Sequence, residues 1–190
     1  MKKTIVVVFL SLITISCKTK TFFKEIVSEK PVKIRSGLQK NDTLKYLHLP
    51  LEFTLKIDSK DIERIEFLLK KDSVYLMPGD GFHSFNGDTN QLKWSFILSK
   101  EKPPKSIYIV PQDLSISSAM LNNLLAKYAP NVKAEDIGTN IKTLDLVPYK
   151  QFRKDFPDYI EEMRKVPDTF GLRIRFPKNH IEIIREQIKW

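Results

Sequence analysis

The apolar residues of this 190-residue chain change their spacing partway along it, and this change constrains the fold more than any other feature. Up to Val110 they stand mostly at every second position, as in Phe53, Leu55 and Ile57, which is typical of half-buried strands. From Ile116 onward they recur at three- and four-residue spacing, as amphipathic helices require. Strands followed by helices predict an α+β domain.

The first half is expected to form antiparallel hairpins. Residues 62–69 fit a strand or a helix, but the turn formers after them and the strand formers at 74–77 favour a strand. Residues 92–98 alternate cleanly, and two consecutive prolines then turn the chain back into 107–110, so these two segments are predicted to pair. Such local pairing argues against a doubly wound parallel sheet.

The second half is expected to hold two or three helices beside the antiparallel sheet of a single domain. The first spans 116–128 and is stopped by Pro130. The second lies at 152–163, where Pro157 is expected to break it and to open a new helix at its first turn. Strands are expected at 144–147, 172–176 and 181–183. For the last of these segments a helix remains the alternative, because Ile184 and Ile188 also fit helical spacing.

The first 17 residues have the parts of a secretory signal. Residues 1–3 are basic, residues 4–15 are apolar, and Ser16 is a small residue just before Cys17, the only cysteine. The apolar run is too short to cross a bilayer, which takes about 20 residues. Ordinary cleavage would leave Cys17 as a free thiol in an oxidising compartment, whereas lipidation would consume that thiol.

This arrangement resembles the signal of bacterial lipoproteins, in which a peptidase cuts before a diacylated cysteine. The resemblance covers residues 1–17 and departs from the usual motif at Thr14, where the family usually carries leucine. It implies that Cys17 carries palmitate-type acyl chains, and two or more chains anchor a protein stably to a membrane. Lys18 stands where an aspartate would favour the inner membrane, which implies the outer membrane, facing the periplasm.

The segment after the lipidation site reads as a tether. It is rich in Lys, Ser, Thr and Glu, and Pro31 and Gly37 interrupt any periodicity. Within it, residues 32–34 could pair as a short edge strand. The chain is therefore expected to divide into a signal peptide at 1–16, a lipidated tether at 17–43 and a single α+β domain at 44–190.

Charge and cysteine content limit the function classes. A chain with one cysteine has no internal disulfide, so packing must stabilise it. The formal net charge is +9, and the lysines are spread along the chain rather than clustered. Such a charge keeps a protein soluble, and attraction to an anionic lipid, lipopolysaccharide or wall surface is the alternative. Nucleic acid is not an expected partner, because no nucleic-acid motif is present.

Residues 78–88 are the one segment with a catalytic composition. Asp80, Asn86 and Asp88 offer oxygen ligands for a hard cation, but their spacing does not match an EF-hand loop. His83 could act as a general base on the serine that follows it, but adjacent residues of an extended chain point apart. The segment is expected to be a long turn. A ligand loop formed by Asp80, His83, Asn86 and Asp88 is the alternative.

No cofactor or metal site is predicted. The three histidines, His48, His83 and His180, lack the spacing of metal ligands. The neighbouring Glu161 and Glu162 would not face each other across a cleft as the carboxylates of a glycosidase do. Neither set of residues therefore predicts a catalytic site.

Two arginines form a possible anion site. Arg173 and Arg175 alternate on one face of a predicted strand, where guanidinium groups could bind a carboxylate or a phosphate. The polar face of an antiparallel sheet explains the same alternation, and we favour that interpretation.

These observations predict a lipid-anchored cell-envelope protein that faces the periplasm and works as a binding or accessory module. They leave enzyme activity open and favour its absence. Its expected partners are the membrane, through the acyl chains, and another envelope protein. An envelope hydrolase or metal-dependent enzyme is one alternative, and it would need His83 to converge with Asp80 or Asp88 in a pocket. A structural lipoprotein is the other.

Overall fold

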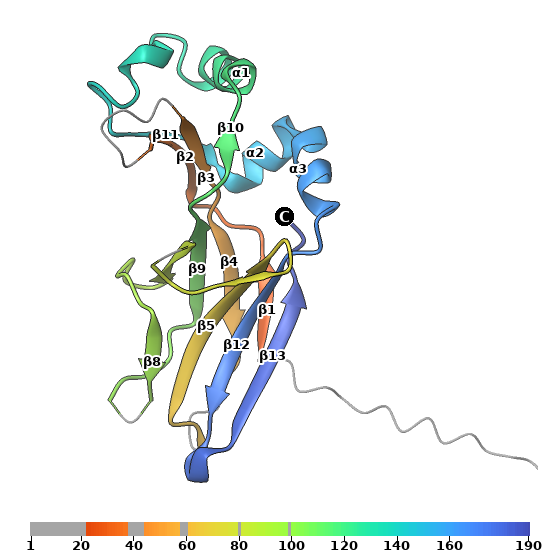
Figure 1. The fold of residues 1–190 in the computed structure, drawn as a ribbon. Helices are drawn as coiled ribbons and strands as arrows, with labels where there is room; N and C mark the ends of the chain where they lie inside the picture. The colour runs from red at the N-terminus through yellow and green to blue at the C-terminus, as the bar shows by residue number, and fades with distance from the viewer. Residues whose placement is uncertain (1–21, 38–43, 58–60, 80, 99) are drawn as a thin grey trace, which may run out of the picture.

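The structure is a computed structural model that describes residues 22–37, 44–57, 61–79, 81–98 and 100–190. It consists mainly of antiparallel strands, with three α-helices in the C-terminal half of the chain (Figure 1). The predicted single α+β domain is confirmed. Among the described residues, no helix has the length and apolar character needed to span a membrane.

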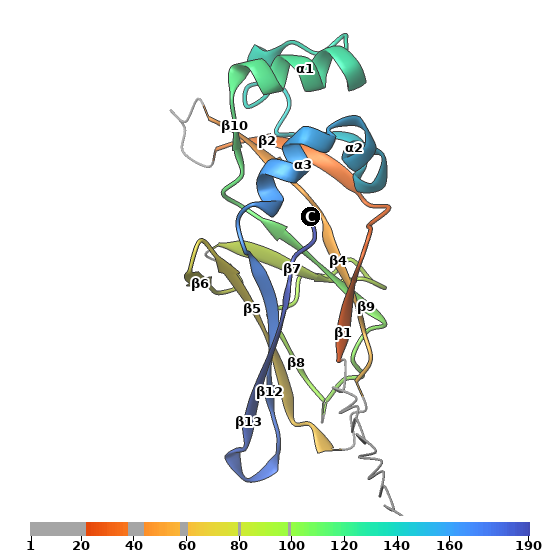
Figure 2. The same cartoon turned by 90° about the vertical axis from the view of Figure 1, so that its right-hand side faces the viewer.

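Two sheets pack face to face in the lower half of the molecule (Figures 1 and 2). Sheet I contains, in spatial order, β1 (Phe23–Ile26), β4 (Leu51–Leu55), β9 (Ser106–Pro111) and β7 (Phe82–Asn86). Sheet II contains β13 (Ile181–Gln187), β12 (Thr169–Arg175), β5 (Arg64–Lys71) and β6 (Val74–Leu76), and β8 (Ser95–Ile97) also pairs with β5.

Aromatic side chains join sheets I and II. Phe53 of β4 stacks on Phe170 of β12 with ring centroids 4.2 Å apart, and Phe23 of β1 meets Phe170 edge-on at 5.4 Å. All three side chains are buried. Aromatic pairs of this kind contribute roughly 0.5–1.5 kcal/mol beyond the burial of their area. This cluster is therefore the centre of the lower core.

Sheet III lies in the upper half with the helices on one side of it (Figure 2). It contains, in order, β10 (Ser115–Ile116), β3 (Lys45–His48), β2 (Pro31–Ser36) and β11 (Thr143–Pro148). The helices are α1 (Ser118–Tyr128), α2 (Tyr149–Asp155) and α3 (Pro157–Arg164), and single-turn 3-10 helices lie at η2 (Ala134–Asp136) and η3 (Pro177–Asn179). Val32 and Ile34 of β2 belong to the same core as Leu124 and Phe152 of the helices.

Three chain segments run through both sheet I and sheet III. β1 leads into β2, β3 into β4 and β9 into β10, so the order β2-β3-β10 in sheet III repeats the order β1-β4-β9 in sheet I. A proline lies at or beside each crossing: Pro31, Pro50 and Pro111. Because proline has no N–H and a fixed φ, it interrupts regular strand pairing and favours a change of direction. The long sheet is therefore bent where these prolines lie.

Residues 22–36 belong to the described fold, so the prediction that residues 17–43 form a tether is wrong for them. Phe22 and Phe23 are buried in the core, and β2 is an interior strand with β3 and β11 on either side, not an edge strand. The polar residues that suggested a tether occupy the outer face of these strands. A strand needs only every second side chain to be apolar to bury one face.

The predicted hairpin between residues 92–98 and 107–110 is also wrong. β8 pairs with β5 in sheet II, whereas β9 pairs with β4 and β7 in sheet I. The break at Pro157 is confirmed, and 181–187 is a strand rather than the alternative helix. Alternation reports that one face of a strand is buried, but it does not identify the strand's partner.

Candidate functional site

A cleft of about 520 Å³ lies where sheet I bends into sheet III. Both sheets contribute to it: β2 and β3 line one side, and β7 and β9 line the other. The bent strands bring together residues that lie far apart in the sequence, from Lys30 to Thr143. Its volume falls within the range of about 300–1,000 Å³ that is common for small-ligand sites.

The cleft lies on the outer face of the bent sheet. In β2, Val32 and Ile34 are fully buried in the core, so Lys33 and Arg35 between and after them point the other way, into the cleft. The same alternation applies to β9, where Ile107 and Ile109 are buried and the residues between and after them line the cleft. The strand pattern therefore separates the core from the cleft.

The upper side of the cleft is basic. The ammonium group of Lys30 donates to Asn90 Oδ1 at 2.7 Å, and Lys33 forms an exposed ion pair of 3.1 Å with Asp145. Arg35 has no carboxylate partner among the described residues. None of the described residues that line the cleft is acidic. The cleft therefore carries an excess of positive charge.

Two histidines lie within this basic surrounding. Burial, with smaller contributions from the neighbouring Arg35, His83 and Lys33, lowers the pKa of His48 to about 4. Burial and Arg35 also lower the pKa of His83. Both imidazoles are therefore neutral at pH 7, and each can donate one N–H to a ligand while remaining uncharged.

Two buried nitrogen atoms of the cleft residues lack a partner in the described part of the chain. They are Nε2 of His48 and Nε2 of Gln112. Burying a polar group without a hydrogen bond costs about 1–3 kcal/mol, so such atoms usually meet water or a ligand. Both nitrogens belong to side chains that line the cleft, as does the side chain of Arg35.

The lower side of the cleft is aromatic. Phe85 of β7 stacks on Tyr108 of β9 with centroids 4.7 Å apart and planes 9° apart, and Lys30 Nζ lies 4.4 Å from the centre of the Tyr108 ring. The carboxylate opposite Tyr108 is Glu52, and it already accepts hydrogen bonds from the hydroxyls of Ser28 and Ser106. The carboxylate of Glu52 is therefore held by these two hydroxyls beside the aromatic side of the cleft, and after burial it is the second cause that raises the pKa of Tyr108.

The structure separates most of the residues that the sequence grouped in 78–88. The expected long turn is wrong, because residues 82–86 form β7. His83 lines the cleft, whereas Asn86 accepts N–H bonds from Asp88 and Thr89 in the turn after the strand, and Asp88 accepts from the Lys105 amide. Asp80 lies outside the described residues, and so does Cys17.

A catalytic pair of His83 and Ser84 is not present. Ser84 is fully buried on the opposite face of β7, and its hydroxyl donates to the carbonyl of Lys93. Within the described residues, no group of three or more His, Cys, Asp or Glu side chains is arranged to hold a metal ion. His180 lies apart from the other two histidines and contacts Glu182 at 3.1 Å.

The two arginines that the sequence singled out lie on sheet II. Arg173 forms a 3.2 Å ion pair with Glu66 of β5, and Arg64 pairs with the other oxygen of the same carboxylate at 3.1 Å. Arg175 lies opposite Arg64 in the register. The chain itself thus supplies a carboxylate to this arginine cluster, which is separate from the cleft.

Sequence reasoning missed most of the cleft residues. Lys33 and Arg35 alternate with buried residues in the segment that was expected to be a tether, and His48 was considered only as a metal ligand. The signal that could have found the cleft is the proline at each of the three strand crossings. No protein-family model, curated protein or solved structure matches this chain.

Proposed function

We propose that this chain is a lipid-anchored protein of a bacterial envelope that binds an anion in the cleft between sheets I and III. One observation carries the binding function: Lys30, Lys33 and Arg35 meet in a concave site that has no acidic residue among its described lining residues. The anchor rests on the signal-like residues 1–17 and on the acylation of Cys17 that their pattern implies.

The chemistry of the cleft favours an anion over a neutral ligand. A guanidinium group binds a phosphate or a carboxylate through two parallel hydrogen bonds, and such charge-assisted bonds are roughly twice as strong as neutral ones. Arg35 can form them because no described carboxylate competes for it. His48 and Gln112 add buried nitrogens that lack a partner. Together these groups suit one anionic group held partly out of water.

The proposed location of the protein indicates which anions it could meet. An acyl anchor at Cys17 would keep the cleft at the periplasmic face of the outer membrane, where lipid phosphates, lipopolysaccharide phosphates and wall carboxylates are abundant. We therefore infer that the ligand is an anionic component of the envelope, presented alone or on an envelope protein. The hydrolase alternative has less support, because burial and, to a smaller extent, neighbouring cations lower the pKa of His83 and His48, which makes both imidazoles weak bases.

Anion binding is testable with inorganic phosphate and the full chain in mild detergent. We expect phosphate to bind the wild type and Arg35→Gln to weaken this binding at least about tenfold, because one bidentate charge-assisted contact is lost. Isothermal titration calorimetry at low salt measures both affinities. Arg185→Gln is the matched control, because Arg185 lies on β13 of sheet II. Equal weakening by the two substitutions, or no binding of phosphate by the wild type, would contradict the proposal.

A further inference from the structure

An apolar row continues from the cleft along the outer face of sheet I. Leu92 lies opposite Phe85, and Phe85 lies opposite Tyr108, so the three side chains share one face. The backbone supports this placement, because the Lys93 amide donates to the Ser84 carbonyl and the Asn86 amide donates to the Gln91 carbonyl. Leu92 is 48% exposed. The row therefore leads from the basic side of the cleft to an exposed leucine.

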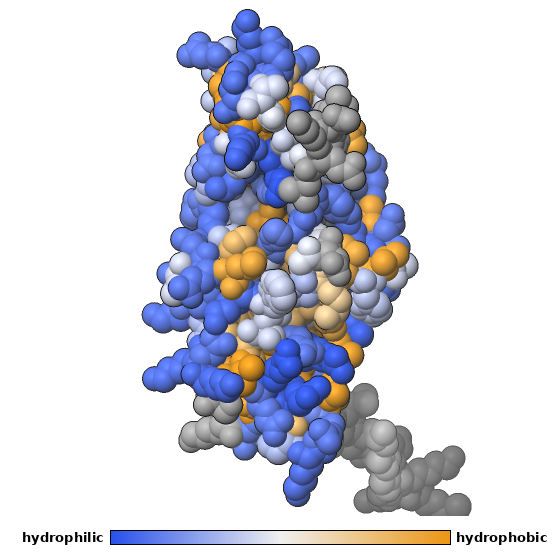
Figure 3. Space-filling model, turned by 60° about the vertical axis from the view of Figure 1, so that its left-hand side comes forward, coloured by the Kyte–Doolittle hydropathy of each residue, from blue (hydrophilic) through white to orange (hydrophobic). Residues whose placement is uncertain are grey.

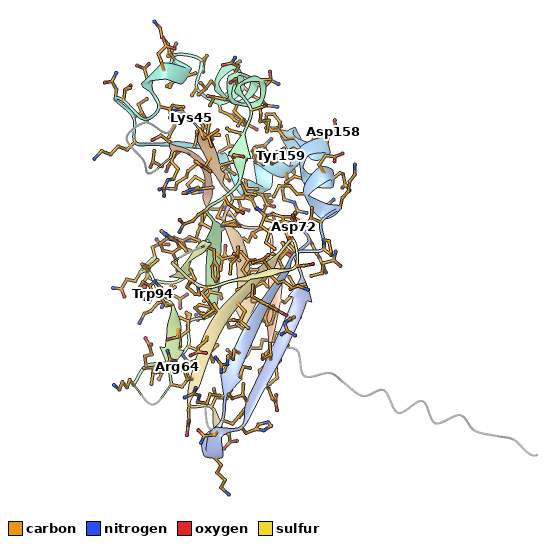
Figure 4. All side chains as sticks on the ribbon, in the orientation of Figure 1. Lys45, Arg64, Asp72, Trp94, Asp158 and Tyr159 are labelled. Carbon is orange, nitrogen blue, oxygen red and sulfur yellow. The ribbon has the colours of Figure 1, made fainter. Side chains whose placement is uncertain are left out.

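Trp94 is a second exposed apolar side chain, close to Leu92 in the chain. It lies two positions after Leu92 and is 62% exposed, the largest exposed fraction among the large hydrophobic side chains described. Figure 4 shows it at the outer margin of the molecule, below sheet III. The space-filling view in Figure 3 shows small groups of hydrophobic residues set among hydrophilic ones on this side. Exposed apolar side chains that gather on one surface mark interaction sites more often than scattered ones do.

The basic and the apolar parts of the surface meet at Tyr108. Lys30 Nζ lies over the ring of Tyr108, and Phe85 is stacked on the same ring. A ligand that fills the whole cleft would therefore meet cations and N–H donors at one end and a row of hydrocarbon and aromatic surface at the other. A small inorganic anion would leave the apolar row uncovered.

We propose that the ligand of this cleft is an amphipathic anion, a phosphate or carboxylate that carries an aliphatic chain. This inference rests on the proposed anion-binding function and adds the chemistry of the rest of the ligand. The anionic group lies beside Arg35, His48 and Gln112, and the chain follows Phe85 and Leu92 toward Trp94. Burial of each methylene raises an affinity about fourfold, so even a few contacts of the aliphatic chain make the whole ligand bind more tightly than inorganic phosphate.

Four soluble probes separate the two parts of the ligand. They are inorganic phosphate, dodecyl phosphate, dodecanoate and the neutral dodecyl maltoside. The full chain is held in a bilayer nanodisc, and each probe is titrated into it by calorimetry. The concentration of each probe stays below its critical micelle concentration. We expect dodecyl phosphate or dodecanoate to bind at least about tenfold more tightly than both inorganic phosphate and dodecyl maltoside. The tighter of the two distinguishes a phosphate source from a fatty-acid source.

Substitutions in the apolar row locate the chain of the probe. The double variant Leu92→Ser/Trp94→Ser is expected to bind the dodecyl anion at least about fivefold more weakly than the wild type does. Its affinity for inorganic phosphate is expected to stay unchanged. Both side chains are exposed, so this variant keeps the fold. Val74→Ser is the matched control, because Val74 is 60% exposed on β6 in sheet II and lies away from the cleft.

Tryptophan fluorescence gives an independent readout of the site. The chain has two tryptophans, and Trp190 is buried, so a blue shift on adding dodecyl phosphate reports Trp94. The inference is overturned if inorganic phosphate binds as tightly as the dodecyl anions, while anion binding itself would stand. It is also overturned if dodecyl maltoside binds as tightly as they do. If none of the four probes binds, the proposed function fails as well.

Discussion

Among single residues, His48 of the cleft makes the stability of the protein depend on pH. Its imidazole is largely buried, and cations surround it, so it is neutral in the folded protein and charges only near pH 4. In the unfolded chain a histidine charges near pH 6.5. Between these two values the unfolded state binds more protons than the folded state does, so the free energy of unfolding falls as the pH decreases through that window.

Replacing His48 tests this dependence. Lowering the pH from 7.5 to 4.5 should reduce the free energy of unfolding of the wild type by about 2 kcal/mol through His48 alone, after allowance for partial solvent screening. The free energy of unfolding of His48→Gln should therefore fall by about 2 kcal/mol less than that of the wild type over the same pH interval. Urea unfolding at the two pH values measures both losses.

The control for this prediction is His180→Gln. His180 is exposed and lies apart from the cleft, so this variant measures what the removal of a surface histidine does by itself. Identical pH losses in the wild type and His48→Gln would show that the burial of His48 does not affect stability.

The same residues show why the cleft was only partly predictable. His83 stood out because residues 78–88 combine a histidine with a serine and two aspartates, and it does line the cleft. Arg35 and His48 carry no local signal, because each is one polar residue in a half-buried strand. They become a site only when β2, β3, β7 and β9 come together at the bend, and the register of these pairs is not encoded in any one strand.

At the level of elements, the sequence predicts each strand and helix better than their partners. The period of the apolar residues identified β4, β5, α1 and the break between α2 and α3. It misassigned the partner of β8, because a half-buried strand fits any sheet that offers an apolar surface. It also missed β7, whose short apolar pattern lies among glycines and aspartates that favour turns.

The contact between sheets I and II should depend on Phe170 more than on any exposed ring. Phe170 contacts Phe23 and Phe53 of sheet I and Phe67 of its own sheet. Phe170→Ala would leave a cavity between the sheets, and such changes typically cost about 3–5 kcal/mol. Tyr75→Ala, at a ring that is 50% exposed on β6, should cost less than about 1 kcal/mol. Urea unfolding compares the two, and a similar cost for both would contradict this account of the core.

For the whole molecule, the proposed anchor restricts how the domain is oriented. Phe22 lies five positions after Cys17 and is already buried in the fold. Five extended residues span at most about 18 Å, so acyl chains on Cys17 would hold the start of β1 close to the membrane surface. Figures 1 and 2 place the start of β1 toward the end of the molecule that carries η3, and α1 at the opposite end. The cleft at the bend lies between these two ends.

This orientation predicts which surface residues lie near lipid. Cys17 is the only cysteine and its thiol would be acylated, so Lys178→Cys or Lys133→Cys introduces a single free thiol for a fluorophore. Lys178 is part of η3, and Lys133 precedes η2 near α1. In vesicles with the acylated protein, a lipid that carries a quencher in its headgroup should quench the label at 178 strongly and the label at 133 weakly. With Cys17→Ala neither label should be quenched, because the chain would leave the membrane. Equal quenching at 178 and 133 would mean that the domain lies along the bilayer, and quenching that persists in Cys17→Ala would mean that something other than acyl chains holds it there.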